Sequence, residues 1–184
     1  MKKSKRSILL IIAIFSLSSV HAQLEVSHLS TRGFSTNGIG AFFNWGIMVN
    51  KGDVITFEPG FTYFDHTAVL TPSIFVGYRH TFNGKGYGLY VEPQLAYMYG
   101  SANIPKKDTT EFPSLGSGKG YIRQPQLSGP TAALGLGYIF PGKFALNLGM
   151  RYEHIFVIGD PAVNIFSLRL AHTFVFGRSR WYHS

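Results

Sequence analysis

The sequence predicts an all-β protein, an eight-stranded antiparallel up-and-down transmembrane β-barrel. Apolar residues alternate with polar or small ones at a period of two through most of the chain, which is typical of strands with two different faces. Tight turns rich in Asn, Gly and Asp separate several of these segments. The chain combines 21 Gly, 16 Phe and 10 Tyr with only 14% charged residues, which suits strands that are apolar on one side and small or polar on the other.

The first 22 residues are expected to be a cleaved signal peptide, which leaves residues 23–184 as one barrel domain. A basic stretch precedes the apolar run 8–17, and Val20-His21-Ala22 offers small residues where signal peptidase reads them. The run is too short to cross about 30 Å of hydrocarbon as a helix. Cleavage lowers the formal net charge from +8 to +4, because 4 of the 17 Lys and Arg are removed and all 9 Asp and Glu remain. This balance argues against nucleic acid as a partner.

The chain has no cysteine, which excludes a disulfide framework, a thiolate metal site and a cysteine nucleophile. It also excludes a lipid anchor attached through a cysteine at the cleavage point. No metal-ligand spacing and no cofactor motif is apparent, so no metal and no cofactor are expected. Among the destinations of an exported chain, the composition favours the outer membrane of a Gram-negative cell.

The predicted strands follow the alternation in order. In 38–49 the odd positions are large and apolar, and a turn at 50–53 leads to 55–63, which alternates again. In 70–82 the apolar phase moves to even positions, and a turn at 83–86 leads to 87–99. After the polar segment 101–128 the alternation returns in three further strands, 132–140, 144–153 and 166–176, the first two separated by a turn at 141–143.

An eighth strand is predicted at 23–34, although His28, Ser30 and Arg32 share the face of Leu24 and Val26. It is included because bacterial single-chain barrels have even strand numbers. With the N-terminus in the periplasm, the three tight turns then lie on the periplasmic side and segment 101–128 forms a long external loop.

Aromatic residues at the strand ends predict the girdles of a membrane barrel. The external girdle is expected to contain Tyr63, Tyr97, Tyr99 and Tyr152, and the periplasmic one Trp45, Tyr87 and Phe144. Pro59 and Pro93 lie within predicted strands and each removes a ladder hydrogen bond, so we expect a local bulge near each.

Six charged residues have the parity of the face opposite the apolar one, three acids against three bases. They are Glu58, Arg79, Glu92, Arg151, Glu153 and Arg169. Eight strands enclose room for side chains and little else, so these residues predict a paired charge network that fills the lumen. The alternative is a gated pore or a proton path. A soluble barrel or sandwich, with its apolar face inward and its charges outward, is the competing fold.

The last hairpin, with Arg151-Tyr152-Glu153-His154 and Asn164-Ile165-Phe166-Ser167-Leu168, resembles that of the lipid A 3-O-deacylases. The resemblance covers about 20 residues and implies a membrane-facing catalytic His, matched by His154. The nucleophile position is Phe156 and the acid position is Asn164, so an activated hydroxyl is lacking and an enzymatic function is not expected.

The whole chain from residue 23 resembles the small OmpA/OmpX-type outer-membrane barrels, with aromatic-rich strands like those of Bacteroidota. Unlike such barrels, it continues past Phe176 to Ser184 instead of ending on an aromatic residue. The resemblance implies outer-membrane lipids and lipopolysaccharide as partners, the barrel assembly machinery during biogenesis, and possible envelope proteins. The basic residues Lys106, Lys107, Lys119 and Arg123 of the long loop are candidates for contact with lipopolysaccharide phosphates.

Three functions remain open at this point. A structural or surface-interaction barrel predicts neither conductance nor lipid chemistry. A narrow gated pore predicts conductance that changes when Glu58 or Arg169 is neutralised, and a lipid A-modifying enzyme predicts dependence on His154.

Overall fold

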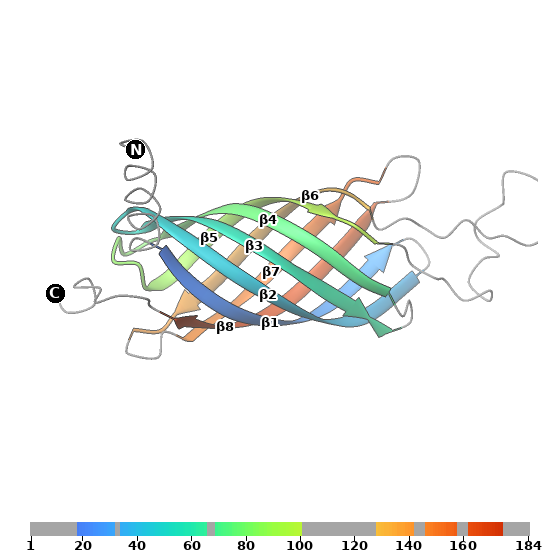
Figure 1. Cartoon of the computed structure of the whole chain (residues 1–184), viewed down its shortest axis with the longest axis horizontal. Coiled ribbons are helices and arrows are strands. Elements are labelled where there is room, and N and C mark those ends of the chain that lie inside the picture. The colour runs from blue at the N-terminus through green and yellow to red at the C-terminus, as the bar shows by residue number, and fades with distance from the viewer. Residues whose placement is uncertain are drawn as a thin grey trace, which may run out of the picture.

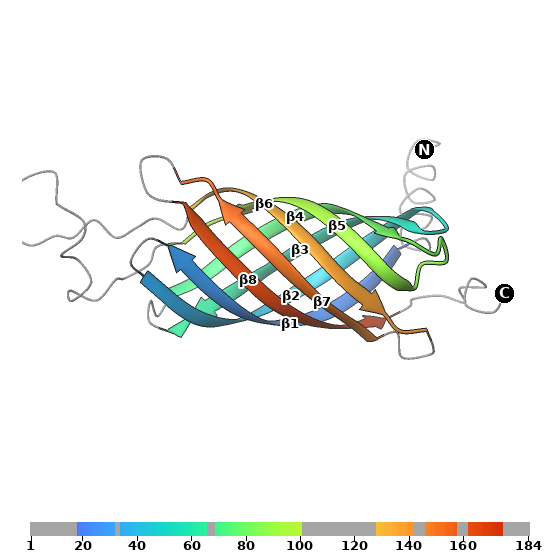
Figure 2. The same cartoon turned by 180° about the vertical axis from the view of Figure 1, so that it is seen from behind.

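The computed structural model describes residues 18–31, 34–65, 69–100, 128–141, 146–157 and 162–174. They form eight strands in one closed antiparallel barrel, in which each strand pairs with its sequence neighbours and β1 pairs with β8 (Figures 1 and 2). The strands are β1 (Ser18–Thr31), β2 (Phe34–Asn50), β3 (Asp53–Phe64), β4 (Val69–Thr81), β5 (Gly88–Met98), β6 (Gly129–Ile139), β7 (Leu146–Ile155) and β8 (Val163–Phe174). The predicted eight-stranded up-and-down barrel is thus confirmed.

The strand limits differ from those read from the alternation. β1 begins at Ser18 instead of residue 23, and β8 begins at Val163 instead of residue 166. The predicted start at residue 23 followed from the predicted cleavage site and not from the alternation. In β8 the alternation detects only the stretch where one face is apolar, whereas the backbone ladder begins earlier, at polar positions such as Asn164 opposite Ser30. Among the described residues no helix is long and apolar enough to span a membrane.

The expected bulges at Pro59 and Pro93 are absent from the described strands. Phe42 pairs with Gly60 and Trp45 with Phe57, so equal numbers of residues on β2 and β3 pass Pro59. The register of β5 passes Pro93 in the same way. A proline lacks one N–H and so weakens the ladder on one side only, which the unbroken ladder on its other side tolerates.

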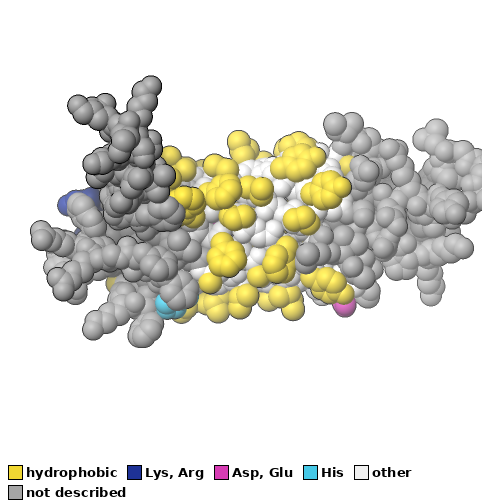
Figure 3. Space-filling view, in the orientation of Figure 1, with side chains coloured by type: hydrophobic (Ala, Val, Ile, Leu, Met, Phe, Trp, Pro, Cys, Tyr) yellow, Lys and Arg dark blue, Asp and Glu magenta, His cyan; other side chains and the backbone are white. Residues whose placement is uncertain are grey.

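The outer surface of the barrel carries the apolar face of every strand. Its most exposed side chains include Leu95 at 72% and Phe43 at 67%. Figure 3 shows hydrophobic side chains gathered over the middle of one face, with the visible charged side chains toward its two ends. The soluble alternative required the opposite arrangement, so this distribution contradicts it.

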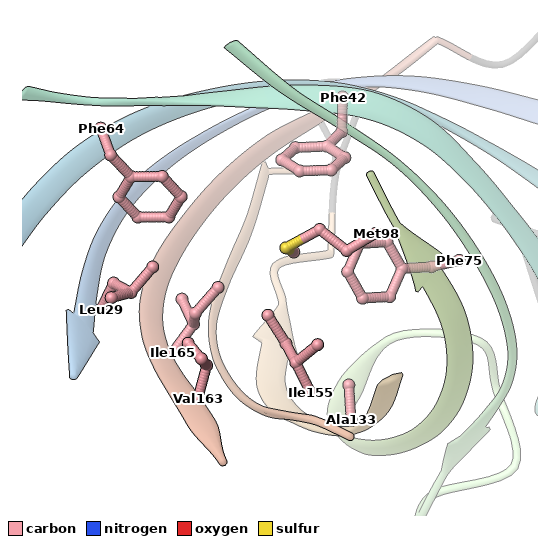
Figure 4. Close-up of a cluster of buried hydrophobic side chains, with 9 residues drawn as sticks. All are labelled: Leu29, Phe42, Phe64, Phe75, Met98, Ala133, Ile155, Val163 and Ile165. Carbon is pink, nitrogen blue, oxygen red and sulfur yellow. The ribbon is translucent and has the colours of Figure 1, made fainter. Parts of the chain in front are cut away.

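The interior is filled by large side chains as well as by charges. We call the end of the barrel where residues 101–127 connect β5 to β6 the loop end, and the opposite end the turn end. The apolar cap is a cluster of buried side chains toward the loop end (Figure 4), formed by Leu29, Phe42, Phe64, Phe75, Met98, Ala133, Ile155, Val163 and Ile165. The expectation of small or polar residues on the inner face was therefore wrong in this part.

Several interior glycines make room for the aromatic side chains of neighbouring strands. A Cβ on Gly60 would lie 2.2 Å from the Phe42 ring, and one on Gly38 would lie 2.6 Å from the Phe64 ring. Near the turn end, a Cβ on Gly137 would lie 2.5 Å from the Tyr90 hydroxyl. The glycine-rich face is thus the complement of a few large side chains, because a closely packed interior leaves no space for both.

Candidate functional site

The buried charges of the barrel form one network across its lumen. All six predicted residues are buried, and they project inward from β3, β4, β5, β7 and β8 because they share the inward parity of their strands. The structure adds Glu25 of β1, which is 2% exposed and had not been assigned to the lumen. The lumen therefore contains four carboxyl groups and three guanidinium groups among the described residues.

Arg151 lies at the centre of the network and is completely buried. Its Nη2 lies 2.9 Å from Glu25, its Nη1 3.0 Å from Glu58 and its Nε 2.7 Å from Glu153. Its guanidinium group also lies 3.9 Å from the centroid of the Phe75 ring and 5.0 Å from that of Phe42. Arg151 thus connects the charge network to the apolar cap, through a cation–π contact on the cap side.

Glu58 accepts contacts from several groups at once. Arg169 Nη2 donates to both of its carboxylate oxygens, at 2.7 and 2.8 Å, and Asn44 Nδ2 donates to Oε1. With the contact from Arg151, these charge-assisted hydrogen bonds satisfy the buried carboxylate. Arg169 also donates to Gln23 Oε1 at 2.8 Å, which ties β1 into the network.

A second centre lies between β4 and β5. Arg79 donates to Glu92 Oε2 through Nε at 3.2 Å and through Nη2 at 2.9 Å, and Thr56 donates to Glu92 Oε1 at 2.6 Å. The Arg79 guanidinium lies 4.8 Å from the centroid of the Tyr90 ring on the turn-end side. Each guanidinium group thus lies beside a carboxylate. Those of Arg79 and Arg151 also lie beside an aromatic ring.

Glu153 is the least supported of the four acids. Arg151 Nε donates to its Oε1, whereas its Oε2 is buried without a hydrogen-bond partner in the described part of the chain. It is also the acid whose strand neighbours, Ala133 and Ile165, both belong to the apolar cap. The excess of one carboxyl group over the guanidinium groups is therefore concentrated at Glu153.

Glu25 was left out of the predicted charge network because the alternation of the first strand is weak. His28, Ser30 and Arg32 obscured the apolar face there, although Gln23, Glu25 and Ser27 already shared the opposite parity. Their inward direction is visible in the structure, where all three are buried and Ser27 hydrogen-bonds Ser167 at 3.0 Å. In this strand the polar residues of the inward face indicate the orientation of the side chains more clearly than the outward residues do.

His154 lies on the outward face of β7 near the loop end and is half-buried. Its Nδ1 lies 2.8 Å from Asn164 Oδ1, and the Tyr152 hydroxyl donates to the same oxygen at 2.8 Å. Its ring contacts Phe156 edge-on, with 4.7 Å between the centroids. His154 is thus oriented by an amide, and its ring contacts a phenyl group at the position where the deacylase comparison required a hydroxyl.

The predicted external girdle agrees with the exposed positions of Tyr63, Tyr97, Tyr99 and Tyr152. Tyr87 of the predicted periplasmic girdle is half-buried and packs against Tyr90 and Ile139 at the turn end. Trp45 is half-buried. Phe144 and the basic residues Lys106, Lys107, Lys119 and Arg123 lie outside the described residues.

Comparison with known proteins gives no match to a family model and none to a curated protein. Among solved structures, Neisserial surface protein A is similar with a TM-score of 0.60 and 16% identity, over 86% of this chain and 97% of that one. Ail of Yersinia pestis, at a TM-score of 0.49 and 15% identity, matches 85% of this chain and 97% of its own length. The N-terminal barrel of Pseudomonas aeruginosa OprF, at 0.47 and 14%, matches 84% and 97%. The first of these similarities shows the fold, that of the small eight-stranded outer-membrane barrels. Nothing in these comparisons supports a deacylase relationship or an origin in Bacteroidota.

Proposed function

We propose that this chain is an integral outer-membrane barrel of structural or surface-interaction type, with a lumen filled by side chains. The observation that carries the proposal is a distribution opposite to that of a soluble protein. The apolar face of each strand is outside, and the charged residues of the described strands, except Asp53 at the first position of β3, are buried inside as ion pairs. A bilayer requires this distribution, because its core solvates apolar side chains and not charges.

The filled lumen favours this role over a pore. The network crosses the barrel in its middle, the apolar cap lies above it toward the loop end, and Tyr90 with Ile139 lies below it. An ion moving through would have to displace an apolar cluster and separate paired charges, both of which are costly. We therefore expect no steady conductance.

Planar-bilayer recording tests this role against the pore. The refolded protein should leave the membrane at its baseline current, and neutralising Glu58 or Arg169 should not create a selective channel. Single-channel steps in the wild type whose size changes in the Glu58→Gln variant would favour the gated pore instead.

The lipid A-modifying alternative would require chemistry at His154. The described neighbours of its ring are Asn164 and Phe156, and the hydroxyl of Tyr152 already donates to Asn164. We therefore expect the mass profile of lipid A to be unchanged when the chain is expressed. Loss of an acyl chain that depends on His154 would overturn this assignment.

The partners that follow from the proposal are outer-membrane lipids, lipopolysaccharide and, during biogenesis, the barrel assembly machinery. Insertion itself is tested by comparing unboiled and boiled outer-membrane fractions on a gel. A compact, detergent-resistant form that migrates differently before boiling is expected, and its absence would contradict the membrane assignment.

A further inference from the structure

The outer face of the barrel carries a polar sector on four adjacent strands near the loop end. We call this sector the polar rim and define it by six outward residues: Tyr152 and His154 of β7, Asn164 of β8, His28 and Ser30 of β1, and Asn37 of β2. All six are exposed or half-buried.

Strand register makes these residues contiguous. His154 pairs with Asn164, Asn164 pairs with Ser30, and His28 pairs with Asn37. Residues paired across neighbouring strands have Cβ atoms about 5 Å apart, so the six side chains form one surface. They come from both ends of the sequence and meet only because β8 closes the barrel onto β1.

Two histidines in this sector are held in the same way. His28 Nδ1 lies 2.8 Å from Asn37 Oδ1, and His154 Nδ1 lies 2.8 Å from Asn164 Oδ1. An amide oxygen can only accept, so each Nδ1 carries the hydrogen and each Nε2 is left for another partner. Asn164 Oδ1 also accepts from Tyr152, so both amide oxygens of the rim are used.

The remaining polar groups of the rim include three hydrogen-bond donors, the amide nitrogens of Asn37 and Asn164 and the Ser30 hydroxyl. Each Nε2 accepts a hydrogen bond in the neutral imidazole, whose hydrogen is on Nδ1, and donates only in the imidazolium form. Among the described residues of these four strands no carboxylate faces outward, because Glu25 and Glu153 are both buried in the lumen. A cluster of donors without an outward acid suits an anion.

The other half of the same barrel end is built differently. On β3 to β5 the corresponding outward positions are Tyr63, Pro72 and Tyr97, followed by Tyr99. Below the polar rim, exposed Val26, Ile39 and Leu168 continue the apolar band, whereas Phe166 lies within the rim, between Tyr152 and His28. Among the described residues, the rim therefore adjoins the acyl chains at the height of lipid headgroups on one side of the barrel.

We propose that the polar rim binds the phosphate of a lipid headgroup in the external leaflet. This inference rests on the proposed membrane function and goes further, because it assigns the lipid contact to the outward face of β7, β8, β1 and β2. The acyl chains of the same lipid would lie along the apolar band beneath, and the amide nitrogens of Asn37 and Asn164 would donate to phosphate oxygens. An adjacent phosphate anion would favour the imidazolium form of each histidine, whose Nε2 would then donate as well.

The test uses the full-length barrel in phosphatidylcholine nanodiscs, with lipid A as the probe. Bisphosphorylated lipid A is titrated in competition with lipid A from which both phosphates have been removed, and bound lipid is counted by native mass spectrometry. The wild type should prefer the phosphorylated form by about tenfold, the size expected for the loss of one charge-assisted hydrogen bond. The double variant His28→Leu/His154→Leu should show no preference.

The control is Tyr97→Phe, which removes one hydroxyl from the aromatic side of the same end and should keep the wild-type preference. If the double variant fails to form the compact heat-modifiable barrel, each single variant is measured, and each should lose part of the preference. Equal binding of both lipids by an inserted wild-type barrel, or full preference in the variants, would overturn the inference. Failure of the wild type to insert would instead contradict the proposed membrane function.

A second copy of the chain is the competing occupant of the rim. Because the chain lacks cysteine, Ser30→Cys introduces a single thiol at its centre. Under mild oxidation in nanodiscs the variant should remain monomeric. Rapid formation of a disulfide-linked dimer would identify the rim as a protein contact and overturn the lipid assignment.

Discussion

At the scale of single residues, the four buried acids are not equivalent. Glu58 contacts Arg151, Arg169 and Arg79, the last at 3.8 Å, whereas within the described part of the chain Glu153 pairs with Arg151 alone. Since three guanidinium groups face four carboxyl groups, removing one negative charge has opposite consequences at these two sites. Glu58 is needed to neutralise its neighbours, and Glu153 carries the excess charge.

We therefore predict that Glu58→Gln lowers the free energy of unfolding by about 3 kcal/mol, the cost of leaving buried charges without their partner. Glu153→Gln should leave stability unchanged or raise it, because its amide oxygen still accepts from Arg151 and the buried charges become balanced. Urea unfolding of the reconstituted barrels measures both. Equal losses in the two variants would show that the charge excess does not reside at Glu153.

At the scale of strands, the interior packing joins a glycine on one strand to an aromatic side chain on the next. Gly60 faces Phe42 in this way, since a Cβ at this position would lie 2.2 Å from the Phe42 ring. Gly135 also faces the lumen, yet its Cβ would meet Arg169 and Glu92 only at 3.3 and 3.4 Å. The two glycines therefore provide a matched pair for testing the packing.

Gly60→Ala should destabilise the barrel by about 1–3 kcal/mol, because the Phe42 ring is forced from its position. Gly135→Ala should cost less, since its neighbours need to move by only a few tenths of an ångström. The combination Gly60→Ala/Phe42→Leu should recover part of the loss. Equal stability of the two single variants, measured by urea unfolding, would mean that Phe42 does not depend on Gly60 for its space.

The first strand connects the predicted processing to the barrel. β1 begins at Ser18, so cleavage after Ala22 would shorten it to residues 23–31, still close to the 9–11 residues of a membrane-crossing strand. Gln23 and Glu25, which contact Arg169 and Arg151, would be retained.

The mass of the protein purified from outer membranes should therefore correspond to a chain that begins at Gln23. A measured mass that includes residues 18–22 would show that the whole of β1 is kept. That result would move the predicted cleavage site toward the N-terminus and leave the barrel assignment intact.

At the scale of the whole molecule, a lysine placed on the apolar outer surface should cost more stability in a membrane barrel than in a soluble one. Leu168 is exposed near the middle of β8, whereas Phe82 is exposed just beyond the end of β4. Leu168→Lys should destabilise the barrel in lipid vesicles by about 2–4 kcal/mol, and Phe82→Lys by about 0–1 kcal/mol. In a soluble protein both surface changes would fall within about 0.5 kcal/mol, so a small effect at Leu168 would contradict the bilayer location.

The alternation by itself determined which face of β2 to β8 is apolar, and with it the barrel and its apolar outer surface. It also determined the inward direction of six charged residues: Glu58, Arg79, Glu92, Arg151, Glu153 and Arg169. Side chains alternate strictly along a strand, so parity can be read without any knowledge of the neighbours. Two predictions from local sequence were wrong or incomplete. The missing N–H of each proline predicted a bulge that the structure lacks, and the obscured apolar face of the first strand concealed the inward direction of Glu25.

Only the tertiary structure decided which residues meet. Arg151 and Glu58 lie 93 positions apart, Arg169 and Glu58 lie 111 apart, and His154 shares a surface with His28 only through the contact of β8 with β1. Parity gives a direction but neither a depth nor a partner across the lumen. Those depend on the register of all eight strands and on the closure of the barrel, which fix the relative heights of side chains that are distant in sequence.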